Sequence, residues 1–482
     1  MWIDFIAFHG ERTPQRPALV LEKTGETLTY GDLHWLASCQ AGYLRRKGVT
    51  RGDRVALLAK NRLEHLTLFF ATMRLGAIFA PLNFRLADPE IQAQLDCIQP
   101  KLFLSDEDRL NSLSLDDQDF GNDPLNHTVT IEMDHVLLML FTSGSTGQPK
   151  GVLLSAGMLL WNAINTHTGW ELKPEDVSVI HTPFFHTGGY NVTCLPLLRL
   201  GGKLVLADFQ PAKMLQIISD NGVTVFFAVP AMFRMMMETP EFHSADLSSI
   251  RFCISGGAPC PSSLIDAWRE RGLPLKQGFG LTEVGPNCFY ISDEDALSRQ
   301  DSVGRPMLHS HIRLIDENGH DVDAGQLGEL AIKGPHVCQG YWQNETEFQN
   351  VFRNGYFHTG DLMTCDEDGF YYVVGRSKDM FISGGENVYP GEVERHLVQH
   401  PNVADAHVLA VPCEKWGEVG FAFLSSPRQL SLEEVRNFLG PLLSRYKHPR
   451  HLLCLNQLPL LPNNKVDRRA LLEMALKELT HG

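Results

Sequence analysis

Apolar runs and amphipathic stretches alternate regularly in the middle of the chain. Residues 204–207 and 223–229 are strand-like, and residues 211–221 between them have the spacing of an amphipathic helix. The pattern repeats with apolar runs at 251–255 and 273–279 around the helical sequence PSSLIDAWRERG. Strand–helix–strand units of this kind form parallel sheets that helices cover on both faces. The sequence therefore predicts an α/β fold.

A second unit of this kind lies earlier in the chain. Strand-like runs at 55–59 and 77–81 flank the helix-like sequence EHLTLFFATMRLG, and we expect a first helix in the N-terminal MWIDFIAFHGERTP. Residues 105–126 are rich in Asp, Asn and Ser. We expect this segment to be an irregular surface excursion.

The pattern changes after the polar segment GRSKD, residues 375–379, which indicates a linker. Shorter strands and helices follow, and Ser431 with Glu434 predicts a capping box at the start of one helix. A chain of 482 residues is too long for one compact core. We therefore predict a large N-terminal domain with helix-covered parallel sheets, residues 1–376, and a small C-terminal α+β domain, residues 377–482.

Charge and cysteine content exclude several classes of partner. The formal net charge of −15 argues against nucleic acid or an anionic membrane surface. The ten cysteines form no C-x-x-C pair, which predicts neither a metal site nor a disulfide framework. We find no basic, signal-like start and no apolar run of about 18 residues. We expect a soluble cytoplasmic protein without an integral membrane segment.

The loop within LFTSGSTGQPKGVLLS, residues 140–155, connects two apolar runs. Glycines allow backbone N–H groups to approach an anion, hydroxyls add donors and Lys150 adds a mobile positive charge, which together suit a polyphosphate. The P-loop NTPase pattern is absent, because only two residues separate Gly144 from Gly147 and Gly151 follows the lysine. The loop predicts a nucleotide site of another kind.

The loop sequence TSGSTGQPKG closely resembles that of the adenylate-forming enzymes, which include acyl-CoA synthetases, luciferases and carrier-loading adenylation domains. Further stretches match the family in the same order: SGGA, GFGLTE, YFHTGDL, GRSKDMFISGGENVYPGEVE and PNNKVDR. The resemblance covers roughly residues 135–470 and is greatest to the acyl-CoA synthetases. It implies that a carboxylate attacks the α-phosphate of ATP, with Mg²⁺ present, and that the thiol of CoA then displaces AMP.

The resemblance assigns the nucleotide-binding residues. The set implied for ATP and AMP is Thr142, Ser143, Gly144, Ser145, Thr146, Gly147, Lys150, Gly256, Gly257, Ala258, Phe279, Gly280, Thr282, Asp361 and Arg376. Thr142 and Glu283 are the implied Mg²⁺ ligands, and helix capping is the alternative for the glutamate. Asp361 and Arg376 would bind the ribose, with a surface ion pair as the alternative. Phe279 replaces the family's usual tyrosine, so it can stack on adenine but cannot donate a hydroxyl.

In the small domain the resemblance makes Lys465 the catalytic lysine that reaches the carboxylate and the α-phosphate, although a solvated loop lysine is the alternative reading. Lys378 occupies the hinge about which a mobile small domain rotates. Gly385 is expected to face the CoA tunnel.

His186 in PFFHTGG is the family's catalytic gate beside the acyl and CoA channels, or else a core histidine. It lines the predicted acyl pocket together with Gly188, Gly189 and Gly257. The resemblance builds this pocket from residues 185–192, 228–234, 256–258 and 279–285. The nearby His181 has no spacing partners that indicate a metal site. Small residues and few fixed cations favour an apolar tail, so we predict a medium- or long-chain fatty acid, with an aromatic or o-succinylbenzoate-type acid as the alternative.

The sequence leaves a luciferase-like oxygenase of the same family open, as well as two rival classes. A carrier-loading enzyme would use a protein-bound pantetheine instead of CoA, and a noncatalytic regulator would bind the nucleotide without chemistry. Lys150, Glu283 and Lys465 argue against the regulator. The pathway and the oligomeric state are left open by the sequence.

Overall fold

The computed structural model describes residues 3–116, 118–125, 128–143, 149–383, 386–413, 416–461 and 465–481. The chain forms two compact units. The first unit comprises Met1–Gly257, Ala267–Ile312 and Ile332–Phe357, and the second comprises Ala258–Asp266, Arg313–Ala331 and His358–Gly482. The boundary predicted between residues 376 and 377 marks where the rotating small domain would begin. This boundary stays a prediction.

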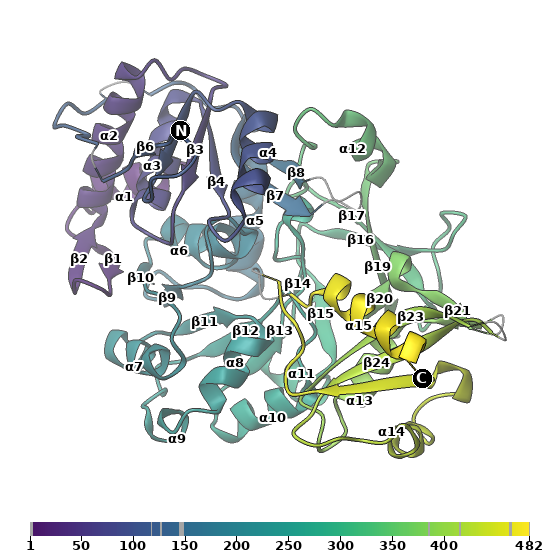
Figure 1. Ribbon diagram of the computed structural model, residues 1–482. Helices are drawn as coiled ribbons and strands as arrows, with labels where there is room; N and C mark the ends of the chain where they lie inside the picture. The colour runs from purple at the N-terminus through teal and green to yellow at the C-terminus, as the bar shows by residue number, and fades with distance from the viewer. Residues whose placement is uncertain are drawn as a thin grey trace. The chain divides into compact units, whose positions relative to one another are not determined.

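The first unit contains a sheet with the strand order β13-β12-β11-β9-β10-β1-β2 (Figure 1). All neighbouring strands in this order are parallel except the β1–β2 hairpin. The strands are β1 Pro17–Leu21, β2 Glu26–Thr29, β9 Val177–Ile180, β10 Lys203–Leu206, β11 Val225–Ala228, β12 Phe252–Ser255 and β13 Leu275–Gln277. The connecting helices are α6 Cys194–Leu200, α7 Pro211–Asn221, α8 Pro230–Met237, α9 Glu241–Ser244 and α10 Ser262–Glu270.

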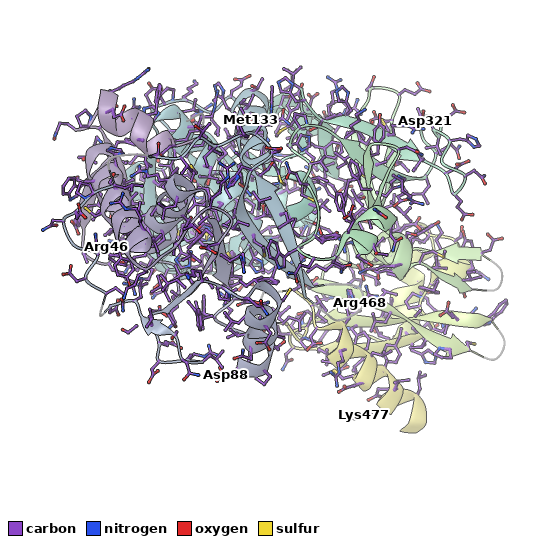
Figure 2. The ribbon with its side chains drawn as sticks, turned by 90° about the horizontal axis from the view of Figure 1, so that it is seen from above. Arg46, Asp88, Met133, Asp321, Arg468 and Lys477 are labelled. Atoms are coloured by element: carbon purple, nitrogen blue, oxygen red, sulfur yellow. The ribbon has the colours of Figure 1, made fainter. Side chains whose placement is uncertain are left out.

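A second sheet of the same unit has the order β6-β5-β3-β4-β7-β8. Its strands are β3 Arg54–Leu58, β4 Ile78–Leu82, β5 Leu102–Ser105, β6 Leu113–Ser114, β7 Val136–Ser143 and β8 Pro149–Ser155. Helices α3 Glu64–Leu75 and α4 Asp88–Ile98 connect its parallel strands, and Asp88 is labelled in Figure 2. Strands β7 and β8 are antiparallel, and the phosphate loop predicted from the sequence joins them.

One large apolar core holds the two sheets together. It contains inward side chains of both sheets and of helices α1 Phe5–Arg12, α2 Tyr30–Arg46, α3, α5 Ala156–Gly169 and α6. An ion pair inside this region fixes the N-terminal segment, because Arg74 Nε donates to Asp4 Oδ2 at 2.8 Å and both side chains are buried. A buried pair of this kind is costly to break from one side.

The first unit contains several further short elements. They are η1 Gly188–Val192, η2 Thr282–Val284, β14 Phe289–Tyr290, α11 Asp293–Ser298, β15 Ser302–Pro306, α12 Glu345–Val351 and β18 Phe352–Arg353.

Most neighbouring strands of the second unit run antiparallel. Neighbouring strands are β20-β19-β17-β16 and, farther along, β22-β21-β24-β23 with β25 beside β24. The bounds are β16 His311–Ile315, β17 Gly328–Lys333, β19 Tyr356–Cys365, β20 Tyr371–Arg376, β21 Phe381–Ser383, β22 Glu386–Val388, β23 Asp405–Cys413, β24 Gly417–Ser425 and β25 His451–Leu455. Short turns η3 Ser377–Asp379 and η4 Arg445–Lys447 complete it with three helices, α13 Pro390–Leu397, α14 Leu432–Leu439 and α15 Arg468–His481.

Strand β24 shows why these helices cover both faces of its sheet. Ala422 and Leu424 pack in one cluster with α13 and α14, whereas Phe421 and Phe423 pack in another with α15. Successive side chains of a strand point to opposite faces, so one strand supplies both cores.

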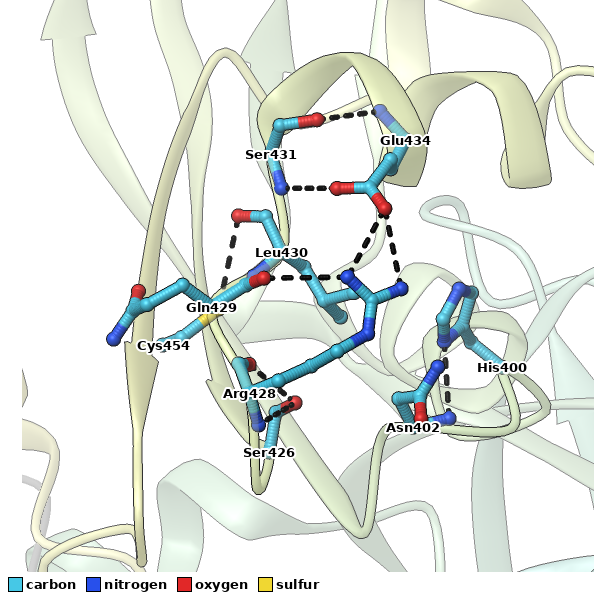
Figure 3. A network of polar contacts seen from close by, with 9 residues as sticks. All are labelled: His400, Asn402, Ser426, Arg428, Gln429, Leu430, Ser431, Glu434 and Cys454. Atoms are coloured by element: carbon cyan, nitrogen blue, oxygen red, sulfur yellow. Dashed lines mark hydrogen bonds and ion pairs between the residues drawn. The ribbon is translucent and has the colours of Figure 1, made fainter.

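The predicted capping box is confirmed at the start of α14 (Figure 3). Ser431 Oγ accepts from the Glu434 backbone N–H at 3.2 Å, and Glu434 Oε2 accepts from the Ser431 backbone N–H at 2.8 Å. Both terminal nitrogens of Arg428 donate to the other carboxylate oxygen at 3.1 Å. These hydrogen bonds lower the pKa of Glu434 to about 2.

The predicted α/β fold and the order of its strands and helices are confirmed. The predicted linker GRSKD is more ordered than expected, because its first two residues end β20 and the next three form η3. The excursion at 105–126 has little regular structure, but Leu115 and Leu125 anchor it in the core. In the part of the chain that the structure describes, no helix is long and apolar enough to span a membrane.

Candidate functional site

The carboxyl ends of four parallel strands bring several predicted residues to one edge of the first sheet. The segments after β9, β11, β12 and β13 carry His186, the 228–234 stretch, Gly256–Gly257 and Phe279–Glu283. Gly278 N–H donates to the Ser255 carbonyl at 2.7 Å, which keeps two of these segments together. Ligands of open parallel sheets bind at this edge. Ala258 belongs to the second unit.

Phe227, at the end of β11, lies between two predicted pocket glycines. A Cβ on Gly188 would lie 3.2 Å from Phe227 Cε1, and a Cβ on Gly256 would lie 3.2 Å from Cε2. The ring edge therefore fills the space that a side chain at either glycine would need. His181 Nε2 donates to the Phe227 carbonyl at 2.8 Å, and burial lowers the pKa of His181 to about 4, so this histidine is neutral.

Gly188 and Gly189 differ in what they face. They begin a π-helical turn, η1, a rare element that is common at functional sites. A Cβ on Gly189 would lie 2.6 Å from the Pro183 carbonyl oxygen and 2.8 Å from the Phe184 Cα, so the backbone itself requires glycine there. Gly188 faces the Phe227 ring instead. His186 is half-buried in the preceding segment, and its carbonyl accepts from Gly189 N–H at 3.0 Å.

Only part of the predicted phosphate loop is described. Gly144, Ser145, Thr146, Gly147 and the Ser143 side chain lie outside the described residues. Thr142 on β7 is the cross-strand neighbour of Lys150 on β8.

Two side chains outside the loop contact Lys150. Its ammonium contacts the Glu347 carboxylate at the start of α12 and lies 5.2 Å from the ring centre of Tyr341. An ammonium over an aromatic face is a cation–π arrangement. The lysine is therefore held by a carboxylate and an aromatic ring.

Tyr341 also contacts the predicted metal-binding carboxylate. Its hydroxyl donates to Glu283 Oε1 at 3.1 Å. Burial and the Glu283 charge raise the pKa of Tyr341 far above its usual range, so the hydroxyl keeps its proton. Cys338 N–H donates to the Glu283 carbonyl at 2.7 Å, and the buried His336 ring contacts the Val284 carbonyl. Segment 336–341 thus fixes both the backbone and the carboxylate of η2.

The same segment pairs with β8. Leu153 N–H donates to the Gly340 carbonyl at 3.0 Å, Trp342 N–H donates to the Gly151 carbonyl at 2.7 Å, and Tyr341 bridges Val152. Lys150 and Glu283 come from distant parts of the sequence, and this pairing places both against Tyr341. Two of the residues assigned to phosphate and metal are therefore brought together.

Asp361 lies on β19 opposite Arg376 on β20. Arg376 Nε donates to Asp361 Oδ1 at 2.8 Å, and the carboxylate is buried. Burial raises the pKa of Asp361, and the Arg376 charge opposes that shift. Among the residues that the structure describes, nothing hydrogen-bonds to Asp361 Oδ2, although this atom is buried. A buried carboxylate oxygen with an open acceptor position suits a hydroxyl donor such as a ribose.

The predicted catalytic lysine lies in a turn of the second unit. Lys465 is exposed, and its carbonyl accepts a hydrogen bond from Leu461 N–H at 2.7 Å. The flanking residues Leu460 and Val466 form an isolated antiparallel β-bridge. Arg468, labelled in Figure 2, pairs with Asp379 at 2.6 Å and so ties this turn to η3, which contains Lys378. Gly385 lies outside the described residues.

Phe279 and Gly280, which are also predicted to bind the nucleotide, each pack closely against a neighbouring residue. The Phe279 ring meets Phe289 edge-on, with centroids 5.8 Å apart. A Cβ on Gly280 would lie 2.3 Å from the Pro286 carbonyl oxygen, so this position requires glycine for packing.

The donor set fits magnesium bound together with a nucleotide. Within the described ranges, no cluster of three or more His, Cys, Asp or Glu side chains forms a metal cage. Mg²⁺ commonly takes one or two protein oxygens and completes its shell with phosphates and water. The Glu283 carboxylate and the Thr142 hydroxyl are hard oxygen donors of that kind.

Sequence reasoning missed Phe227, Tyr341, Glu347 and His336. Phe227 directly precedes the stretch assigned to the pocket, and Tyr341 lies in a Gly-Tyr-Trp sequence, so weak signals were present. Glu347 and His336 have no local signal, because their contacts are made across the fold.

The chain matches known protein families and proteins along most of its length. The profile of the AMP-binding enzyme family matches residues 7–342, and that of the AMP-binding enzyme C-terminal domain matches residues 392–465. A feruloyl-CoA synthase of Amycolatopsis is 35% identical over 463 residues, covering 93% of this chain and 94% of that protein. An indoleacetate–CoA ligase of Aromatoleum aromaticum is 35% identical over 494 residues, covering 97% and 96%.

A solved structure is similarly close. The o-succinylbenzoate CoA synthetase of Bacillus subtilis, in complex with its acyl-adenylate intermediate, superimposes with a TM-score of 0.88 at 30% identity and covers 97% of each chain. The chain therefore belongs to the AMP-binding enzyme family. It is an AMP-forming acid–thiol ligase that uses ATP, Mg²⁺ and CoA.

Replacing Asp361 by Asn tests the ribose assignment. A charge-assisted hydrogen bond contributes about 1.5–3 kcal/mol, so we expect the wild type to bind ATP roughly 10- to 100-fold more tightly than 2′,3′-dideoxy-ATP. Asp361→Asn should remove most of this preference, as measured by titrating each nucleotide. Equal weakening of both nucleotides would show that Asp361 supports the fold and does not contact the ribose.

Proposed function

We propose that this enzyme joins CoA to a compact aromatic monocarboxylic acid through an acyl-adenylate, releasing AMP and pyrophosphate. The position of the Phe227 ring carries this proposal. The names of the relatives support it, since feruloyl, indoleacetate and succinylbenzoate groups all contain an aromatic ring. The predicted fatty acid therefore gives way to the alternative stated with it.

The Phe227 ring argues against a long, flexible tail. Gly188 and Gly256 have no side chains, but the Phe227 ring lies 3.2 Å from where a Cβ on either glycine would be and so occupies that space. A fixed aromatic wall limits length and offers a face on which another ring can stack. A planar acid fits this arrangement better than a long acyl chain.

The charge pattern favours an acid with a single carboxylate. Residues 183–192 contain no Asp, Glu, Lys or Arg, and the 228–234 stretch has a single cation, Arg234, at its last position. A second carboxylate on the tail, as in a succinylbenzoate, would be buried without a cation from residues 183–192, which is costly. A feruloyl- or indoleacetate-like acid avoids that cost.

The residue roles follow the chemistry of the two steps. Asp361 with Arg376 would hold the ribose, Gly256 to Ala258 and Phe279 would flank adenine, and the bound Mg²⁺ would neutralise charge on the phosphates. Lys150 would bind the β- and γ-phosphates. These assignments orient the α-phosphate for attack by the acid.

The remaining assignments concern the reacting atoms. Thr282 would lie near the α-phosphate, and Lys465 would stabilise the charge that gathers there as the carboxylate attacks. In the second step the thiol attacks the acyl carbon, and AMP leaves with one of the original carboxylate oxygens. We propose that Lys378 is the hinge between the steps and that His186 and Gly385 border the CoA channel.

A panel of acids tests the proposed function. We expect AMP and acyl-CoA with ferulate- or indoleacetate-like acids at a kcat/KM at least roughly tenfold above that for octanoate, palmitate or o-succinylbenzoate. Coupled AMP assays and chromatography of the CoA thioester measure both products. Preference for palmitate would restore the fatty acid prediction, and ATP binding without turnover of any acid would favour the regulator.

Truncating Phe227 tests its role as the wall. Phe227→Ala should raise the ratio of kcat/KM for a linear C8–C12 acid to that for the best aromatic acid by roughly tenfold or more, because pocket contacts of this size are worth 1–3 kcal/mol. Gly188→Ala should have the opposite effect. Its added Cβ would press on the Phe227 ring and lower kcat/KM for bulky acids. If Phe227→Ala is unstable, Phe227→Leu replaces it in this comparison of kcat/KM values. A uniform change for all acids would contradict the role of the ring.

A further inference from the structure

The contact between Lys150 and Glu347 has a consequence for nucleotide binding. We propose that Glu347 competes with the ligand's phosphates for Lys150, so that its carboxylate holds the lysine in the empty enzyme and takes it back as pyrophosphate leaves. This inference rests on the proposed role of Lys150 as a ligand of the β- and γ-phosphates.

The ion pair is well sheltered for a contact at a binding site. The Lys150 side chain is 11% exposed and that of Glu347 is 26% exposed. The Tyr341 ring covers the ammonium from another side. Screening by water and salt is weaker here than at an open surface, so the carboxylate is an effective competitor.

The backbone of α12 fixes where the carboxylate lies. Asn344 caps the helix and its side chain accepts from Glu347 N–H at 3.3 Å, which places Glu347 in the first turn. Lys150 has a flexible four-carbon stem on β8, so the lysine is the partner that moves. Displacing the pair needs a ligand with more negative charge than one carboxylate, which a triphosphate or a pyrophosphate supplies.

Different nucleotide ligands should therefore respond differently. ATP and pyrophosphate carry the phosphates assigned to Lys150, and each must take the lysine from Glu347. AMP lacks these phosphates and leaves the pair intact. Neutralising Glu347 should tighten the first two ligands and leave AMP unchanged.

The test is Glu347→Gln, which keeps the side chain's size and removes its charge. We expect the dissociation constants of Mg-ATP and of pyrophosphate to fall by roughly three- to tenfold, because the lysine no longer has to be released by a competing partner. The dissociation constant of AMP should stay within about twofold, and pyrophosphate should become a stronger product inhibitor in the same proportion. Calorimetric titration measures binding without any acid.

The matched control is Glu345→Gln. Glu345 lies in the same first helical turn and its removal changes the net charge and the helix terminus equally. This variant should bind ATP like the wild type. If Glu347→Gln folds poorly, Glu347→Ala replaces it in the same titrations, provided that its melting temperature equals that of the wild type.

Other outcomes separate two failures. If Glu347→Gln left ATP affinity unchanged or weakened it while Lys150→Ala weakened ATP and not AMP, the competition proposal would be wrong and the phosphate role of Lys150 would stand. If Lys150→Ala changed neither ligand, the proposed role of Lys150 would itself be wrong.

Discussion

The pairing of residues 339–342 with strand β8 is the constraint on which the predicted phosphate end of the site depends. Three backbone hydrogen bonds fix the register, from Gln339 N–H to Leu153, from Leu153 N–H to Gly340 and from Trp342 N–H to Gly151. That register places Tyr341 where its ring covers Lys150 and its hydroxyl reaches Glu283. A shift by one residue would turn Tyr341 to the other face and separate the two groups.

The acid and nucleotide ends depend on a different constraint, the common direction of the strands. Parallel strands end at one edge, so short loops after β9, β11 and β12 meet without long connections. Glycine is needed at particular points of this edge, and the reasons differ. At Gly189 and Gly280 the neighbouring backbone leaves no room for a side chain, whereas at Gly188 and Gly256 an aromatic ring occupies the space.

Much of the fold was predictable, because apolar periodicity and capping residues are local signals. The strand–helix alternation and the capping box of Ser431 with Glu434 are confirmed at nearly the expected bounds. The structure shows an ion pair between Asp361 and Arg376, the contact given as the alternative to ribose binding, and their ribose role stays a prediction.

The site residues that sequence reasoning missed share one property. Phe227, Tyr341 and Glu347 act through partners more than thirty residues away, at Gly188, Glu283 and Lys150. No spacing rule predicts such contacts. The fatty acid prediction gave way to the proposed aromatic acid for a related reason, because the glycines at 188 and 256 indicated open space before the position of the Phe227 ring was known.

An acyl-adenylate pathway transfers one oxygen of the acid to the nucleotide. An aromatic acid labelled with ¹⁸O in both carboxylate oxygens, incubated with ATP, Mg²⁺ and CoA, tests it by mass spectrometry of the products. We predict AMP that carries one ¹⁸O, unlabelled pyrophosphate and an acyl-CoA that retains the other ¹⁸O. Unlabelled AMP, or label in phosphate with release of ADP, would contradict an acyl-adenylate pathway.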